Sequence, residues 1–243
     1  LFSAALAHPQ SNAQSIEINL SGFDPFVVPI YAANFDSQSI KAPSKLPLDR
    51  SSALALGAVH QLIKNTHLNL DELDKSRVGI FWGSGMSGAS SLDSATKALY
   101  ADKRRIRPTS VITSMPNAPA AEISLLLGVN GPCLTYATAC ASSAVAIGEA
   151  MLAIASGRVD IAIVGGSESM LSPGVLASWD ALRVIANMKN GAKDACRPFD
   201  EQRTGFALGE GAAAFVIESS THAQKHGRSP VAILSGYATN CDG

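Results

Sequence analysis

The chain has 243 residues, of which 47% are hydrophobic and 16% charged, and its formal net charge is −1. This composition excludes a disordered chain and is typical of an α/β protein with a large buried core. The balanced charge argues against a nucleic-acid or membrane-surface partner, and the longest apolar stretch, 141–155, contains Glu149 and is too short for a membrane span.

From the amino-terminus, 1–47 is punctuated by prolines, and we expect loop-rich edge structure there. Beyond it, apolar spacing and glycine stops predict helices over 50–65, 90–100, 118–127, 141–156 and 219–226. Short apolar runs predict strands over 78–82, 133–139, 160–164, 212–217 and 231–237. Strands that alternate with helices favour a mostly parallel α/β sheet.

The predicted helix 141–156 is apolar or small on every side, and Glu149 is its only charged residue. A helix of this kind has to be covered all round. A position between two sheets satisfies that need, because the many alanines and glycines permit close approach.

Four cysteines occur, at 133, 140, 196 and 241, with no CxxC pair and no spacing typical of metal ligands. A disulfide framework is not expected in a chain of this size, so a reducing compartment is favoured. No basic region precedes the first apolar residues, so we expect no signal peptide. With the cysteine spacing, this leads us to expect a cytoplasmic protein with no metal site.

Cys140 stands where a predicted strand ends and a predicted helix begins. A thiol at a helix amino-terminus lies at the positive end of the helix dipole, beside unpaired backbone N–H groups, and both favour the nucleophilic thiolate. The alternative is a small buried residue with no chemistry, because free cysteine is among the most buried residue types. Local sequence leaves both open.

Three motifs in register decide between them. They are NGPCLTYATACASS at 130–143, DIAIVGGSE at 160–168 and RPFDEQRTGFALGEG at 197–211. In this order and spacing they resemble the amino-terminal half of the β-ketoacyl synthases of the thiolase superfamily, the condensing enzymes of fatty-acid and polyketide synthesis. The resemblance runs from about Asp49 to the end.

This resemblance implies the layered α-β-α-β-α thiolase-like fold, with its mostly parallel mixed sheet, represented by its amino-terminal half only. We expect 1–243 to form one amino-terminal ketoacyl-synthase domain, beginning inside the helix that follows the family's first strand. The family's second half carries two active-site histidines, a lysine and a glycine-rich loop. Nothing in this sequence corresponds to them, so we expect a fragment of a longer protein that is inactive alone as a condensing enzyme.

The resemblance also implies the chemistry. Cys140 would take an acyl group from an acyl carrier protein as a thioester, and an enolate from a decarboxylated malonyl thioester would attack it. No cofactor is expected, because the phosphopantetheine arm of the carrier arrives with the substrate.

The expected acyl channel includes Met86, Ser110 and Trp179, with Ser110 projecting from a dimer partner. Segment 113–122 matches the family's dimer-forming region, so a homodimer or a heterodimer with a related synthase subunit is expected. The basic run Lys103, Arg104, Arg105 and Arg107 is interpreted first as a solvated loop and second as a docking site for an acidic carrier protein.

Other functions compete with this one. A non-catalytic chain-length-factor-like subunit shares the fold but typically lacks the cysteine, and thiolases fit the later motifs less well. The 83–88 stretch, GSGMSG, matches GxGxxG and suggests a dinucleotide-binding oxidoreductase, with Asp102 near the position of a ribose-binding acid. No strand is predicted around Asp102, and a lone GxGxxG is weak evidence.

Overall fold

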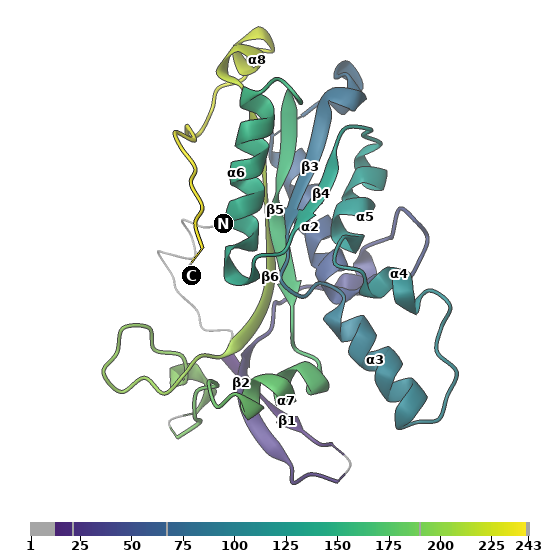
Figure 1. Ribbon diagram of the computed structural model, residues 1–243, viewed down its shortest axis with the longest axis vertical. Coiled ribbons are helices and arrows are strands. Elements are labelled where there is room, and N and C mark those ends of the chain that lie inside the picture. The colour runs from purple at the N-terminus through teal and green to yellow at the C-terminus, as the bar shows by residue number, and fades with distance from the viewer. Residues whose placement is uncertain (1–12, 21, 67, 190, 242–243) are drawn as a thin grey trace.

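A computed structural model describes residues 13–20, 22–66, 68–189 and 191–241 of the chain (Figure 1). Its centre is a six-stranded sheet in the order β1-β2-β6-β5-β3-β4. The strands are β1 (Ala13–Ile18), β2 (Phe26–Tyr31), β3 (Val78–Gly83), β4 (Cys133–Tyr136), β5 (Ile161–Ser169) and β6 (Leu208–Glu218). Strands β2 and β6, β5 and β3, and β3 and β4 pair in parallel, whereas β1–β2 and β5–β6 are antiparallel. The mixed, mostly parallel sheet predicted from the sequence is therefore confirmed.

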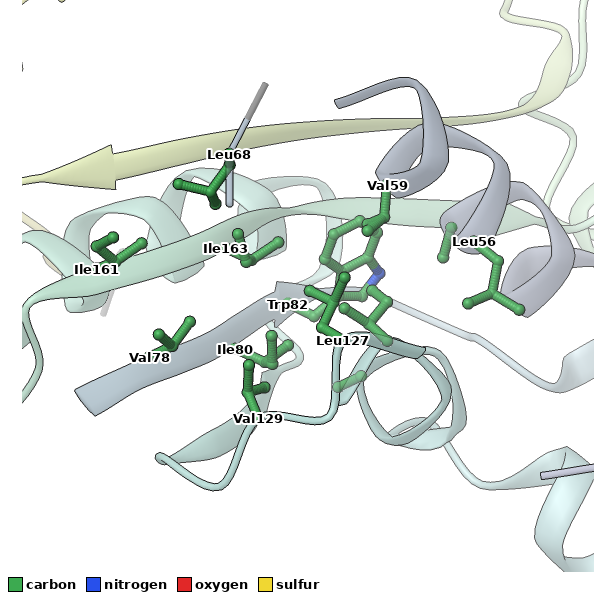
Figure 2. Packing of buried hydrophobic residues seen from close by; sticks show 13 residues of the cluster. Leu56, Val59, Leu68, Val78, Ile80, Trp82, Leu127, Val129, Ile161 and Ile163 are labelled. Atoms are coloured by element: carbon green, nitrogen blue, oxygen red, sulfur yellow. The ribbon is translucent and has the colours of Figure 1, made fainter. Parts of the chain in front are cut away.

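Strands β3 and β5 are covered on both faces, and their successive side chains alternate between two cores. Ile80 and Trp82 of β3 belong to one core, which α2 (Arg50–Thr66) and α5 (Ala118–Leu127) cover (Figure 2). Phe81, between them, belongs to the opposite core, under the alanine face of α6 (Ser142–Ala155). Figure 1 shows α6 and α5 on opposite sides of β3 and β5.

These layers account for three of the five layers implied by the family resemblance. The alanines Ala146, Ala150 and Ala153 of α6 pack against the sheet. On the other side of α6, Gly148 is buried under the ring of Tyr237, so closely that a Cβ at 148 would overlap the ring. Leu152 is 48% exposed, so the helix is covered on only part of its circumference by the residues that the structure describes.

The amino-terminal part is more regular than predicted. Strands β1 and β2 form an antiparallel hairpin inside the stretch expected to be loop-rich, and the expected start within a family helix falls in 1–12, outside the described residues. The hairpin packs with α7 (Pro173–Ala181), which the sequence did not predict, around Ile18, Val28 and Leu176.

The remaining helices are α3 (Ala89–Tyr100), α4 (Ser110–Ser114), α8 (Ser220–Lys225) and the 3-10 turns η1 (Ser37–Ser39), η2 (Leu70–Glu72), η3 (Lys75–Arg77), η4 (Ala139–Ala141) and η5 (Ala192–Asp194). The predicted helix over 118–127 is confirmed at both ends, and Gly128 closes it with a φ of 62°. No helix among the described residues has both the length and the apolar character needed to cross a bilayer.

The predicted strand over 231–237 is wrong. Val231 and Ile233 are exposed, and the segment forms no regular structure. Valine and isoleucine favour strands where they pack against neighbours, and Val231 and Ile233 lie in solvent instead, so their β propensity alone does not form a strand. Strand β4 is also shorter than expected, because the chain turns after Tyr136 instead of continuing to 139.

Candidate active site

Cys140 lies in the 3-10 turn η4, between the end of β4 at Tyr136 and the start of α6 at Ser142. Because β3, β4 and β5 run in parallel, this turn lies at the carboxyl end of the sheet, where Gly83 and Gly166 face each other in register. The thiol-bearing residue is exposed and belongs to no disulfide. The predicted arrangement, a cysteine between a strand and a helix amino-terminus, is confirmed, with a 3-10 turn inserted.

Two glycines, Gly83 of β3 and Gly166 of β5, let the start of α6 pack closely against these strands. A Cβ at Gly83 would lie 2.5 Å from the carbonyl oxygen of Ser142, and a Cβ at Gly166 would overlap the hydroxyl of Ser143. No side chain fits at such distances, so only glycine permits this packing. The turn that carries Cys140 therefore rests directly on backbone of the central strands.

The hydroxyl of Ser142 holds the turn itself. Its oxygen accepts a hydrogen bond from the Thr138 N–H at 2.9 Å and donates one to the Ala139 carbonyl oxygen at 2.6 Å. Ala139 has a φ of 49°, in the left-handed region that residues with a Cβ seldom adopt. The residue immediately before Cys140 is thus held in an unfavourable backbone conformation.

A carboxylate fixes the loop that follows β3. Glu168, on β5, accepts hydrogen bonds from the N–H groups of Gly85 (2.7 Å) and Met86 (2.9 Å). Gly85 also packs on the turn, since a Cβ there would lie 3.6 Å from the Ala139 carbonyl oxygen. These two amides point at a side chain of the same protein, so they are not free to bind a pyrophosphate as a dinucleotide loop requires.

Behind this loop runs a network of buried hydroxyls that ends on Asp49. The Asp49 carboxylate accepts from the N–H and the hydroxyl of Ser51 and of Ser91. Ser51 and Ser87 share a 2.5 Å hydrogen bond, and the Ser84 hydroxyl accepts from the Ser87 N–H at 3.0 Å. The first turns of α2 and α3 are thereby tied to the loop beside Cys140.

A second buried carboxylate, Glu210 of β6, anchors the base of this region. It forms a salt bridge with Arg50 at 2.6 Å and accepts from the Ser169 hydroxyl and the Ala33 N–H. Burial opposes ionisation of Glu210, but these hydrogen bonds and the Arg50 charge outweigh it and hold the pKa of the carboxyl below its ordinary value. Glu168 and Glu210 are thus hydrogen-bonded groups near strand ends.

With the geometry of the Cys140 turn described, the sequence comparison names the family. The family described as "Beta-ketoacyl synthase, N-terminal domain" matches residues 26–223. The chain belongs to the β-ketoacyl synthase family. This membership sets aside the dinucleotide-binding oxidoreductase.

Relatives of known name agree with this assignment. The chain is 37% identical over 196 residues to Nodulation protein E of Rhizobium leguminosarum bv. trifolii. This match covers 80% of this chain and 47% of the relative. It is 36% identical over 197 residues to the 3-oxoacyl-[acyl-carrier-protein] synthase 2 of Staphylococcus aureus, covering 80% of this chain and 48% of that enzyme. The chain thus spans about half the length of the curated relatives it matches.

Solved synthases share the fold. A β-ketoacyl synthase from Burkholderia phymatum STM815 superposes with a TM-score of 0.72 at 27% identity, over 84% of this chain and 50% of that one. The ketosynthase of a type II polyketide synthase, solved with its acyl-carrier protein, gives 0.68 at 27% identity over 82% and 56%. The ishigamide ketosynthase/chain length factor, at 22% identity and a TM-score of 0.78, supports the thiolase-like fold alone.

The three residues predicted to line a synthase channel come from three separate elements. Met86, on the loop between β3 and α3, is 44% exposed and adjoins the Cys140 turn through Gly85. Ser110 is the first residue of α4. Trp179, on α7, packs edge-on against Phe206 and belongs to the core of the hairpin.

Sequence reasoning missed the hydroxyl of Ser142. Its hydrogen-bond partners are main-chain groups of Thr138 and Ala139, and these carry no side-chain signal. The available signal was its place two residues after Cys140, at the start of a helix, where serine commonly caps backbone groups.

Proposed function

We propose that this chain is the nucleophile-bearing half of a 3-oxoacyl-[acyl-carrier-protein] synthase of fatty-acid or polyketide synthesis. The observation that carries the proposal is the exposed Cys140 in a rigid turn at the start of α6, within a chain of this family. The positive end of the α6 dipole favours negative charge there.

Acyl transfer comes first. The Cys140 thiolate attacks the carbonyl carbon of an acyl thioester on the carrier, the bond from that carbon to the phosphopantetheine sulfur breaks, and the released thiolate takes up a proton. The backbone N–H of Cys140 is our candidate for one donor to the oxyanion that forms on the way. Sulfur suits this role because the thioester stays reactive toward carbon nucleophiles.

Condensation follows. A malonyl thioester loses carbon dioxide, and the electron pair of the broken carbon–carbon bond forms an enolate. Its carbon attacks the thioester on Cys140, which leaves as thiolate, so the product is a 3-oxoacyl chain two carbons longer. We assign enolate stabilisation to the two histidines of the family's second half, so we expect this chain alone to transfer acyl groups without condensing them.

The acyl group needs an apolar channel, for which we propose Met86, Ser110 and Trp179. Met86 is the best supported, because its loop contacts the turn of Cys140. Ser110 would reach the channel of a neighbouring subunit from α4. Trp179 equally serves the core of the hairpin, so its substitution is expected to lower stability as well as change selectivity.

A dimer is proposed on the same side of the molecule as α4. Strand β4 lies at the end of the sheet order, with its outer edge unpaired by the described strands. Exposed apolar side chains accompany it on β4, α4 and α5, namely Leu134, Val111, Ile112, Met115 and Leu125. The partner is a second copy or a related synthase subunit, and size-exclusion chromatography with light scattering tests the association.

An acyl carrier protein is the proposed substrate donor. Lys103, Arg104, Arg105 and Arg107 are all exposed in the loop between α3 and α4, as a docking site for an acidic carrier requires. We place the protein in the cytoplasm, where a reducing environment keeps the Cys140 thiol free.

The test is transfer of an acyl group from an acyl-carrier-protein thioester, read as the intact mass of the chain. We expect one added acyl group, its loss in Cys140→Ser, and its retention in Cys133→Ser, which removes another exposed cysteine on the adjoining β4. Carrier binding without acylation of Cys140 would instead favour a chain-length-factor-like subunit.

A further inference from the structure

The backbone around Cys140 adopts a conformation that its own sequence does not favour. Ala139 has a Cβ and a φ of 49°, and such left-handed residues persist only where the surroundings hold them. The turn before Cys140 also closes on itself, through a 3.1 Å hydrogen bond from the Ala141 N–H to the Thr138 carbonyl oxygen. The question is which side chain holds it.

Ser142 is the only side chain that the structure records as hydrogen-bonded to the described backbone of 138–141. It bonds the N–H of Thr138 and the carbonyl of Ala139, the groups on either side of the bend. The residue is 3% exposed, so water cannot readily replace its hydroxyl. Both hydroxyl functions, one donor and one acceptor, are used on this turn.

The anchor is itself fixed. Ser142 is the first residue of α6, and its backbone sits against Gly83 at a distance that admits no Cβ. Because this packing fixes the position of Ser142, the conformation of the turn adjusts to the serine hydroxyl. The hydroxyl therefore constrains the direction of the Cys140 peptide N–H and of its Cα–Cβ bond, which carries the sulfur.

We propose that Ser142 is a positioning residue for the nucleophile, holding Ala139 in its left-handed conformation so that the Cys140 sulfur and N–H face an incoming acyl carbonyl together. Without the hydroxyl, Ala139 relaxes toward negative φ and the two groups lose their alignment. The inference rests on the proposed function, since alignment matters for acyl transfer and far less for reaction with a small alkylating agent.

The experiment compares Ser142→Ala, Ser142→Thr and the control Ser156→Ala. Ser156 donates to the Ala153 carbonyl three residues back, as Ser142 does to Ala139, but at the opposite end of α6. Threonine keeps a hydroxyl that can reach the carbonyl three residues back. Each variant is assayed for acyl transfer from a carrier thioester and for iodoacetamide alkylation, with peptide mass spectrometry to separate Cys140 from Cys133.

We expect Ser142→Ala to slow acyl transfer by about 10- to 100-fold, the scale of an ångström-sized misplacement. Alkylation of Cys140 should change by less than about 3-fold, Ser142→Thr should recover most of the transfer rate, and Ser156→Ala should match the parent protein. Equal transfer rates for Ser142→Ala and Ser156→Ala would overturn the proposal, and so would a parallel fall in transfer and alkylation.

The failure of the proposed function is separately visible. If the parent chain itself accepts no acyl group, that function fails, and the positioning proposal is judged by amide hydrogen exchange at Thr138 and Ala141. Exchange at both amides should be at least about 10-fold faster in Ser142→Ala than in Ser156→Ala, because the hydroxyl then no longer holds the turn. Unchanged exchange would reject it.

Discussion

Replacing Gly83 by alanine tests the close packing under the Cys140 turn. The new Cβ would lie 2.5 Å from the Ser142 carbonyl oxygen, whereas real Cβ contacts essentially never fall below 3.0 Å, so the start of α6 must withdraw by about 0.5 Å. Overpacking against backbone costs about 1–3 kcal/mol, and the lower entropy of the unfolded alanine chain returns about 0.4–1 kcal/mol. We therefore expect a net loss of about 1–2 kcal/mol, near the middle of the span of about 0–2.6 kcal/mol that these two terms allow.

The assay is urea unfolding followed by far-ultraviolet circular dichroism, with Gly211→Ala as the matched control. Gly211 lies on β6, and a Cβ there would meet nothing within 4 Å, so this variant should stay within about 0.5 kcal/mol of the parent. At this chain length the Gly83 variant should melt about 2–8 °C lower. Equal unfolding midpoints for the two variants would refute the packing argument.

Three further outcomes are expected. Arg50→Ala should lower the free energy of unfolding by about 2–3 kcal/mol, because it leaves the buried Glu210 carboxylate without its cation, and urea unfolding at neutral pH measures it. Because the pKa of Glu210 is lowered in the folded protein, its contribution to stability is fully present above the unfolded-chain pKa and is lost as pH falls through the folded pKa. Glu210→Gln should therefore flatten the acid side of a profile of melting temperature against pH. In Glu168→Ala, amide exchange at Gly85 and Met86 should accelerate about 10-fold or more, with slower exchange regained in Glu168→Asp only if the shorter carboxylate still reaches both amides.

Much of the fold was predictable because its signals are local. The helix over 118–127 has a proline near its start and Gly128 at its end, and the structure confirms both boundaries. The hairpin of β1 and β2 was missed because Pro29 within β2 argued against a strand. Pro29 is tolerated because β2 pairs with β6 only at Ile30 and Tyr31, so its other edge is free at the proline.

The candidate site was likewise predictable only in part. A cysteine between a strand and a helix was readable from residue order. The left-handed φ of Ala139 and its hydrogen bond to Ser142 were not, because an alanine gives no sign of a positive φ and the partner of Ser142 is a main-chain group. The strand predicted over 231–237 failed because β-favouring residues form a strand only where they pack against neighbours, and Val231 and Ile233 are exposed.

The elements around Cys140 differ in how much substitution they can tolerate. The Cys140 turn adjoins glycines at the end of β3 and within β5, where an added Cβ would meet the first residues of α6 at less than 3.0 Å. The positions proposed for the channel, Met86, Ser110 and Trp179, lie on a loop and on two peripheral helices instead. Substitutions at the proposed channel positions can therefore change the proposed channel without moving the strands and helix that hold Cys140.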